Sequence, residues 1–116
     1  MTSKQALELL KKEDVDGFNE WVKQRRKKGK KAVDLDDQNL SGLKLRRADL
    51  RDAHLNGCNL RGCDLEGADL RNARLRQADL RKANLTRADL SHANLKQSKR
   101  KGTVFKKANL DDVKGL

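Results

Sequence analysis

The chain has 116 residues, and its 28 Lys and Arg residues outnumber the 17 Asp and Glu residues to give a formal net charge of +11. This length predicts a single domain, whose core must come from leucine and alanine because aromatic residues make up only 3% of the sequence. No apolar run approaches the length of a membrane span and no signal peptide is recognisable, so we expect a cytoplasmic protein without a transmembrane segment.

Residues 1–31 differ from the rest of the chain and predict a short helical cap followed by a basic linker. Thr2 and Gln5 have the spacing of a capping box at the start of a first helix. Asp14 or Asp16 can begin a second helix. The apolar stripe of that helix consists of Val15, Phe18 and Val22, with Trp21 beside them. Helices this short lack a core of their own, so we expect them to cover the open end of the domain that follows.

The stretch Arg25–Lys31 carries six basic residues in seven. Repulsion between their charges and the presence of Gly29 predict an exposed, mobile linker between the cap and the next domain. The alternative is an arm that contacts phosphate groups. Trp21 and Phe18, which precede the linker, are expected to pack within the cap rather than to form a ligand-binding box.

From Ala48 to Leu95 a five-residue pattern recurs ten times, with a leucine at its centre. Ala or Cys stands two positions before each leucine, and Asp or Asn usually stands directly before it. On an α-helix a period of five would scatter the leucines around the axis, and on a flat strand it would alternate them between the faces. The leucines share one interior only if the backbone turns a corner every five residues, which is the logic of a solenoid.

The tandem motif A(D/N)LxX resembles the pentapeptide-repeat family over roughly residues 33–116, and the segment LLKKEDVDGFNEW more weakly resembles caps of that family. The resemblance implies an all-β solenoid, a right-handed quadrilateral β-helix with four repeats in each coil. Residues 32–116 would then form about four coils behind the helical cap. The resemblance also implies a homodimer through the C-terminal coil as one option, because family members often pair at that end.

Four repeats in each coil would stack residue i on residue i+20. The inward column Leu40, Leu60 and Leu80 then reaches Arg100, where burial of a guanidinium would be costly. We therefore expect Gln97–Thr103 to bulge out as a loop, with the repeat resuming after it.

Stacking would also gather charged residues into rows on the outside of the coils. The candidate binding surface is a basic patch consisting of Arg61, Arg74, Arg76, Arg81, Lys82, Lys96, Lys99, Arg100 and Lys101. An acidic row on another side consists of Asp49, Asp69 and Asp89, partly offset by Arg51 and Arg71. Two interpretations stay open: a mixed, soluble surface whose Asp and Asn side chains bond to turn backbone, and a basic side that docks an acidic partner. The patch has no aromatic side chain, which disfavours recognition of single strands by base stacking.

No catalytic, cofactor or metal site is expected from the sequence. His54 and His92 take outward positions on different sides without a nucleophile nearby, so we expect both to be solvated. Cys58 and Cys63 fill the small inward position of consecutive repeats, which predicts core packing. No further Cys or His stands at a spacing that would make them a metal site.

These patterns leave three functions open. The first is a non-catalytic scaffold that binds an acidic protein, nucleic acid or membrane surface through the basic patch. The second follows from the family resemblance, because some members resemble duplex DNA and inhibit or protect topoisomerases; such mimicry needs a strongly negative rod, whereas this chain is positive. The third is a structural repeat domain with no dedicated partner.

Overall fold

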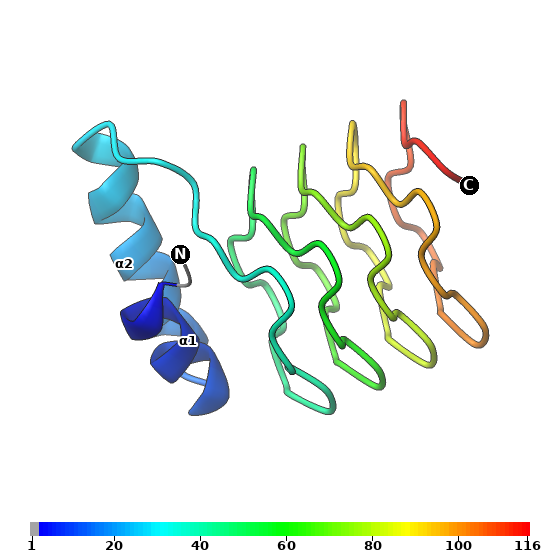
Figure 1. The fold of residues 1–116 in the computed structure, drawn as a ribbon, viewed down its shortest axis with the longest axis horizontal. Coiled ribbons are helices and arrows are strands. Elements are labelled where there is room, and N and C mark those ends of the chain that lie inside the picture. Colours follow the sequence, from blue (N-terminus) through cyan, green and yellow to red (C-terminus); the bar gives the residue numbers. More distant parts are fainter. Residues whose placement is uncertain (1–2) are drawn as a thin grey trace.

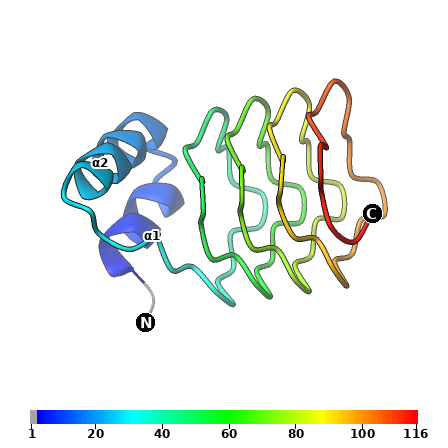
Figure 2. The same ribbon diagram turned by 90° about the horizontal axis from the view of Figure 1, so that it is seen from above.

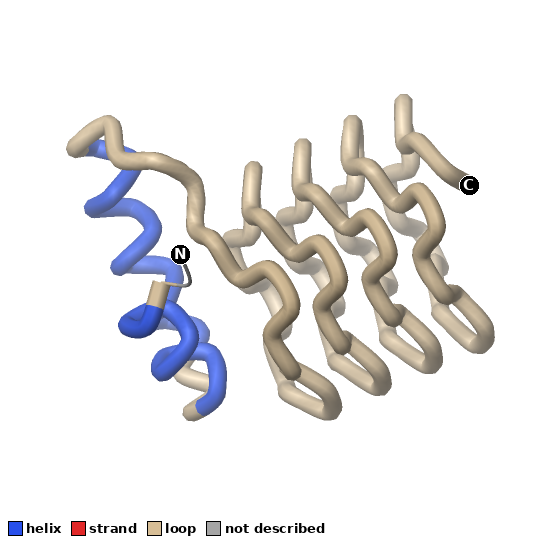
Figure 3. Tube along the Cα trace, in the orientation of Figure 1, coloured by secondary structure: helices blue, strands red, loops and turns tan. Residues whose placement is uncertain are grey.

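A computed structural model describes residues 3–116 as two short helices followed by a stack of coils (Figure 1). Helix α1 spans Lys4–Lys11 and helix α2 spans Val15–Lys27. Both helices lie across one end of the stack, and the last residues of the chain lie at the other end (Figure 1 and Figure 2). The rest of the described chain runs as turns and short extended pieces without a regular strand (Figure 3). No helix within residues 3–116 is long and apolar enough to cross a membrane.

Parallel backbone bridges join each coil to the next, and every bridge pairs a residue with the one 20 positions later. Two hydrogen bonds recur in this ladder. A centre leucine donates to the following coil, as Leu50 N does to Asp69 O at 2.8 Å, and the residue before the leucine donates to the preceding coil, as Asp69 N does to Ala48 O at 3.0 Å. The repeating leucines therefore form a solenoid, as their period predicts, and the parallel bridges between its coils make it a β-helix.

The corners of the coils explain which residues occupy the turn positions of each five-residue repeat. Each corner contains one residue with a left-handed backbone, at φ values from +55° to +77°. Gly57 shows why some corners hold glycine: a Cβ at this position would lie 2.2 Å from Asp37 Oδ1 in the coil before it. The Asp and Asn side chains support the corners as expected, because many of them accept a backbone N–H two residues later, as Asn84 Oδ1 does from Thr86 N at 3.0 Å.

The interior of the coils is one continuous apolar core. The centre leucines from Leu35 to Leu95 are each at most 1% exposed, with alanine or cysteine packed beside most of them. The Cys58 thiol donates to Leu35 O at 2.8 Å and the Cys63 thiol donates to Leu40 O at 2.7 Å. Burial raises the pKa of Cys58 to about 12 and that of Cys63 to about 11, so both thiols stay protonated and serve as core residues.

The two helices form the cap that the sequence predicts, and their apolar residues join the core of the coils. Thr2, part of the expected capping box, lies outside the described residues, and Ser3 stands at the start of α1 without a side-chain capping bond. Asp14 caps α2, accepting a hydrogen bond from Gly17 N at 2.9 Å. The buried side chains of the cap belong to Ala6, Leu10, Phe18 and Val22.

Polar side chains of the cap complete the hydrogen bonding of the first coil. Asp49 N has no preceding coil to bond, and it donates instead to Asn19 Oδ1 at 2.8 Å, while Asn19 Nδ2 donates to Arg47 O at 3.0 Å. Lys44 N likewise donates to the carboxylate of Glu13. The cap therefore covers both the apolar end of the core and the open edge of the backbone ladder.

The basic linker is shorter than the sequence predicts, because Arg25, Arg26 and Lys27 belong to α2. Basic side chains are favourable in the last turn of a helix, where the backbone carbonyls give a partial negative charge. Gly29 terminates the helix, since its φ of +66° allows Gly29 N to donate to Arg26 O and Lys30 N to donate to Arg25 O.

The predicted bulge at Gln97–Thr103 is wrong, since the ladder continues through this stretch. Lys99 N donates to Ala78 O at 2.9 Å, and Lys99 forms a bridge with Asp79. Arg100 can occupy an inward column because it lies at the open end of the stack and is only half-buried. Its guanidinium Nη1 donates to Gly115 O at 2.8 Å and to Ser98 Oγ at 3.1 Å, so its charge is never fully removed from polar partners.

Candidate functional site

The solenoid brings most of the predicted basic patch together on neighbouring positions of its outer surface. Arg76 and Lys96 stack at one corner, Lys99 lies on the side that follows, and Arg61, Arg81 and Lys101 stack at the next corner. Arg74 lies two residues before Arg76 in the sequence, and Lys82 directly follows Arg81. We call this set the basic surface: Arg61, Arg74, Arg76, Arg81, Lys82, Lys96, Lys99 and Lys101. Arg100 lies apart from it, because its guanidinium turns to the C-terminal end of the core.

Asp79 is the carboxylate that lies within the basic surface. Arg81 holds it with two hydrogen bonds, from Nε to Oδ1 at 2.8 Å and from Nη2 to Oδ2 at 2.6 Å. This guanidinium lowers the pKa of Asp79 to about 2, so the pair stays ionised at neutral pH and Arg81 is electrically balanced. The other seven members of the basic surface are exposed and form no ion pair within residues 3–116.

The acidic row differs from the basic surface because two of its three aspartates, Asp49 and Asp69, are each paired closely with an arginine. Arg51 Nη2 lies 2.6 Å from Asp49 Oδ2, and Arg71 Nη2 lies 2.7 Å from Asp69 Oδ2. In both pairs, as in Asp79 and Arg81, the arginine follows the aspartate by two residues across a leucine. The short motif Asp-Leu-Arg is therefore a sequence signal for a balanced arginine, which sequence reasoning anticipated at Arg51 and Arg71 but missed at Arg81.

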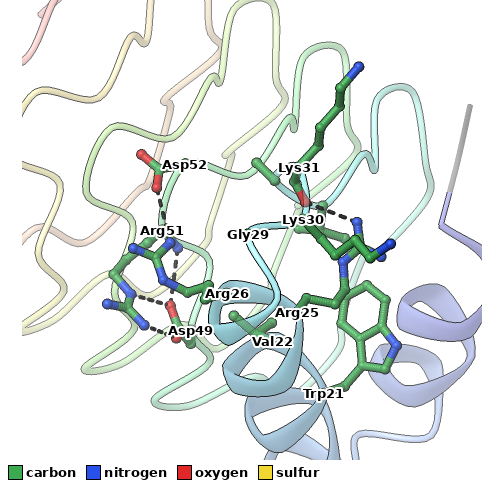
Figure 4. A pocket seen from close by; sticks show the side chains of 12 residues that line it. Trp21, Val22, Arg25, Arg26, Gly29, Lys30, Lys31, Asp49, Arg51 and Asp52 are labelled. Atoms are coloured by element: carbon green, nitrogen blue, oxygen red, sulfur yellow. Dashed lines mark hydrogen bonds and ion pairs between the residues drawn. The ribbon is translucent and has the colours of Figure 1, made fainter.

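A cavity of about 280 Å³ lies where α2 and the linker meet the first coil (Figure 4). Its arginine and aspartate side chains are already engaged with one another or with neighbouring groups. Arg25 stacks on Trp21 at 4.8 Å and donates to Lys31 O at 2.9 Å, and Arg26 pairs with Asp52 at 3.1 Å. The cavity therefore lies at the joint between the cap and the solenoid, where Trp21 packs against Phe18 and Arg25 and acts as a packing residue, as predicted.

The two histidines lie on different parts of the surface, as expected, but in different surroundings. His92 is exposed at a corner, with its Nδ1 lying 3.7 Å from Asp112 Oδ2. His54 is half-buried and lies close to Asp34 and Asp36, so that ligand atoms of all three residues are within 4.8 Å of one another. Sequence reasoning did not find this cluster, although the stacking of Asp34 on His54 follows from the spacing of 20.

A family model described as pentapeptide repeats matches the chain with eight copies, over residues 31–67, 58–97 and 84–114. The chain belongs to the pentapeptide-repeat family. The fold that this family resemblance implied for the repeats is thereby established as a β-helix solenoid. No match was found among curated proteins.

Three solved structures of cyanobacterial pentapeptide-repeat proteins are similar to this chain. A protein of Nostoc PCC 7120, alr5209, is 38% identical over 71% of this chain and 55% of its own, with a TM-score of 0.51. HetL from Nostoc sp. strain PCC 7120, a protein involved in heterocyst differentiation regulation, is 36% identical over 69% of this chain and 39% of its own, with a TM-score of 0.48. Rfr23 from Cyanothece 51142 is 34% identical over 74% of this chain and 62% of its own, with a TM-score of 0.48. The chain thus spans about two fifths to three fifths of these relatives.

Proposed function

We propose that this pentapeptide-repeat protein is a non-catalytic scaffold whose basic surface docks an acidic macromolecule. The proposal takes the solenoid as a right-handed quadrilateral β-helix of about four coils behind the cap of residues 1–31. One observation carries it: the arginines beside the acidic row are balanced by aspartate, whereas Arg76, Lys96 and Lys99 are exposed without an ion pair within the described chain. Uncompensated charge on a rigid frame attracts a polyanion at little ordering cost.

The geometry of the basic surface favours contacts with a regular anionic backbone. Successive coils are separated by about 4.8 Å, the spacing of hydrogen-bonded chains, so stacked side chains such as Arg76 and Lys96 form short rows of positive charge. No aromatic side chain lies among these rows, so stacking on bases would contribute nothing to affinity. Duplex DNA and heparin, which present dense charge without requiring base stacking, are therefore the first probes.

The proposal predicts that the protein binds a short DNA duplex with an affinity that falls steeply as salt is raised. The triple variant Arg76→Asn, Lys96→Asn and Lys99→Asn removes three charges while keeping residues that the repeat accepts, since Asn56 and Asn59 occupy the same columns. We expect it to weaken binding at least tenfold and to lower the salt slope by about 0.9 for each phosphate that the variant no longer neutralises. Fluorescence anisotropy across a salt series measures both quantities, and heparin in place of DNA tests whether the surface prefers a duplex.

The matched control is Lys23→Gln, Lys27→Gln and Lys106→Gln, which removes three exposed charges outside the basic surface. If the control weakens binding as much as the first triple variant does, binding follows net charge and the assigned surface is wrong. Absence of binding to either probe at low salt would contradict a polyanion such as nucleic acid as the partner, and would leave an acidic protein or no partner at all.

The last coil supports a second proposal, that two copies associate through their C-terminal ends. The N–H groups of Phe105 and Leu110 have no backbone acceptor within residues 3–116, although the N–H groups of the centre leucines from Leu35 to Leu95 usually bond the next coil. Side chains of the last coil are only partly covered by the core. A second copy would satisfy both the open backbone edge and the apolar end.

Sedimentation velocity over a range of protein concentrations tests this association. We expect Leu110→Lys to shift the protein to the monomer, because the charge would lie in the joined ends. Val104→Lys is the control: Val104 is 45% exposed on the outer side of the same coil, and its column begins with Lys44. A wild-type monomer at every concentration, or an equal effect of both variants, would contradict association through this end.

A further inference from the structure

His54 and two carboxylates meet on the first two coils, near the end of the stack that the helices cover. The backbone bridge between these coils pairs Asp34 with His54, so their side chains leave the same side of the solenoid one above the other. Asp36 follows at the adjoining corner. One ligand atom from each of the three residues lies within 4.8 Å of the other two, and all three residues are half-buried.

The backbone ladder holds these side chains in place. Asp34 Oδ1 accepts a hydrogen bond from Asp36 N at 3.1 Å, and Asp36 Oδ1 accepts one from Asn56 N at 2.8 Å. The two coils are joined at the same point, where Leu35 N donates to His54 O at 2.8 Å. The cluster therefore belongs to a rigid part of the fold, which lowers the ordering cost of binding an ion.

We propose that Asp34, Asp36 and His54 bind a divalent first-row transition metal ion, with water completing its coordination. One imidazole nitrogen and two carboxylate oxygens form a donor set that such ions accept. Ligand atoms around Zn²⁺ lie about 3–4 Å apart, so small rotations of the three side chains bring the cluster to the required geometry. Arg74 follows His54 in the same column, one coil further on, but its exposed side chain is free to extend into solvent.

The proposal concerns only the first two coils and does not depend on the basic surface. Its ligands come from both coils, so a bound ion would link them and raise the melting temperature of the protein. Titration calorimetry of untagged protein with Zn²⁺ is expected to show one ion bound by each chain. We expect His54→Asn and Asp36→Asn each to weaken Zn²⁺ binding at least about tenfold. Both variants suit the repeat, because Asn94 and Asn56 occupy the same columns and Asn56 N can still donate to an amide oxygen.

Two matched variants outside the cluster control for general losses of imidazole or charge. His92→Asn copies Asn72 of the preceding coil, and Asp89→Asn copies Asn109 of the following coil, so both should leave Zn²⁺ affinity unchanged. The proposal is overturned if the wild-type protein shows no saturable binding, or if these controls weaken it as much as the cluster variants do. The absorption spectrum of the protein with Co²⁺ provides a second test of the ligands. A sulfur-to-cobalt charge-transfer band would assign the ion to Cys58 or Cys63 and refute the proposed ligands.

Discussion

Leu70→Ala is expected to lower the free energy of unfolding by about 3 kcal/mol. Leu70 is completely buried in the middle of the stack, where Leu50 and Leu90 occupy the same inward column in the coils before and after it. Hydrogen bonds to both neighbouring coils fix the walls of the core around its side chain, so the structure has little freedom to close the cavity. Urea denaturation followed by far-ultraviolet circular dichroism measures the change, provided that the slope with denaturant stays the same.

Leu110→Ala is the matched control for this prediction. Leu110 belongs to the same column, but it lies in the last coil and is only partly buried. In the monomer, its truncation removes less surface from the core and leaves no closed cavity, so at protein concentrations at which the chain is monomeric we expect the free energy of unfolding to fall by less than about 1 kcal/mol. Equal effects at Leu70 and Leu110 would show that the position within the stack does not determine the contribution of a leucine.

The fold was predictable from the sequence because each repeat encodes both its inward and its corner positions. A leucine every five residues is compatible with neither regular helix nor flat strand, so Leu60, Leu65 and Leu70 could share one core only in a coiled backbone. The cap was predictable for a similar reason: Asp14 and the spacing of Phe18 and Val22 mark a helix with one apolar face. Both signals are local, and the structure contains both features.

Arg100 shows where reasoning from a repeat fails. The spacing of the repeats identifies its column but not the environment of that column, which changes from closed core to open end within one coil. An arginine is costly in the first setting and acceptable in the second, where Nη1 reaches Gly115 O and Leu95 O. The predicted bulge followed from treating every inward position as equally buried, and the end of the stack breaks that assumption.

The candidate sites were predictable in position but not in pairing. The spacing of 20 places Arg76 above Lys96 and Asp34 beside His54 without any coordinates. The spacing does not give the direction of each side chain, and that direction decides which charges pair. Arg81 forms an ion pair with Asp79. Lys99 lies in the same column as Asp79 but forms no ion pair within residues 3–116. The hydrogen bonds of Asn19 with the first coil were also unpredictable, because they depend on how the cap docks.

Phe18→Ala is expected to lower the free energy of unfolding by about 3 kcal/mol and to loosen the cap selectively. Phe18 is fully buried between α2 and the first coil, so its truncation opens a cavity where the two parts of the core join. Hydrogen exchange should report the location of the damage. Asp49 N, which bonds to Asn19 in the cap, should exchange faster, while Asp69 N, which bonds to Ala48 O one coil further on, should keep its protection.

Trp21→Ala is the control for the cap, because Trp21 stacks on Phe18 with ring centroids 6.2 Å apart but is only half-buried. The substitution removes the hydrogen bond from Nε1 to Gln5 Oε1 and the stacking with Arg25, which together should cost about 1 kcal/mol. If Phe18→Ala exposed the amides of Asp49 and Asp69 equally, cap and coils would unfold as one unit. Selective exposure of Asp49 would instead mean that the coils hold together without the cap, since each inner coil is bonded on both edges and only the first coil relies on the helices.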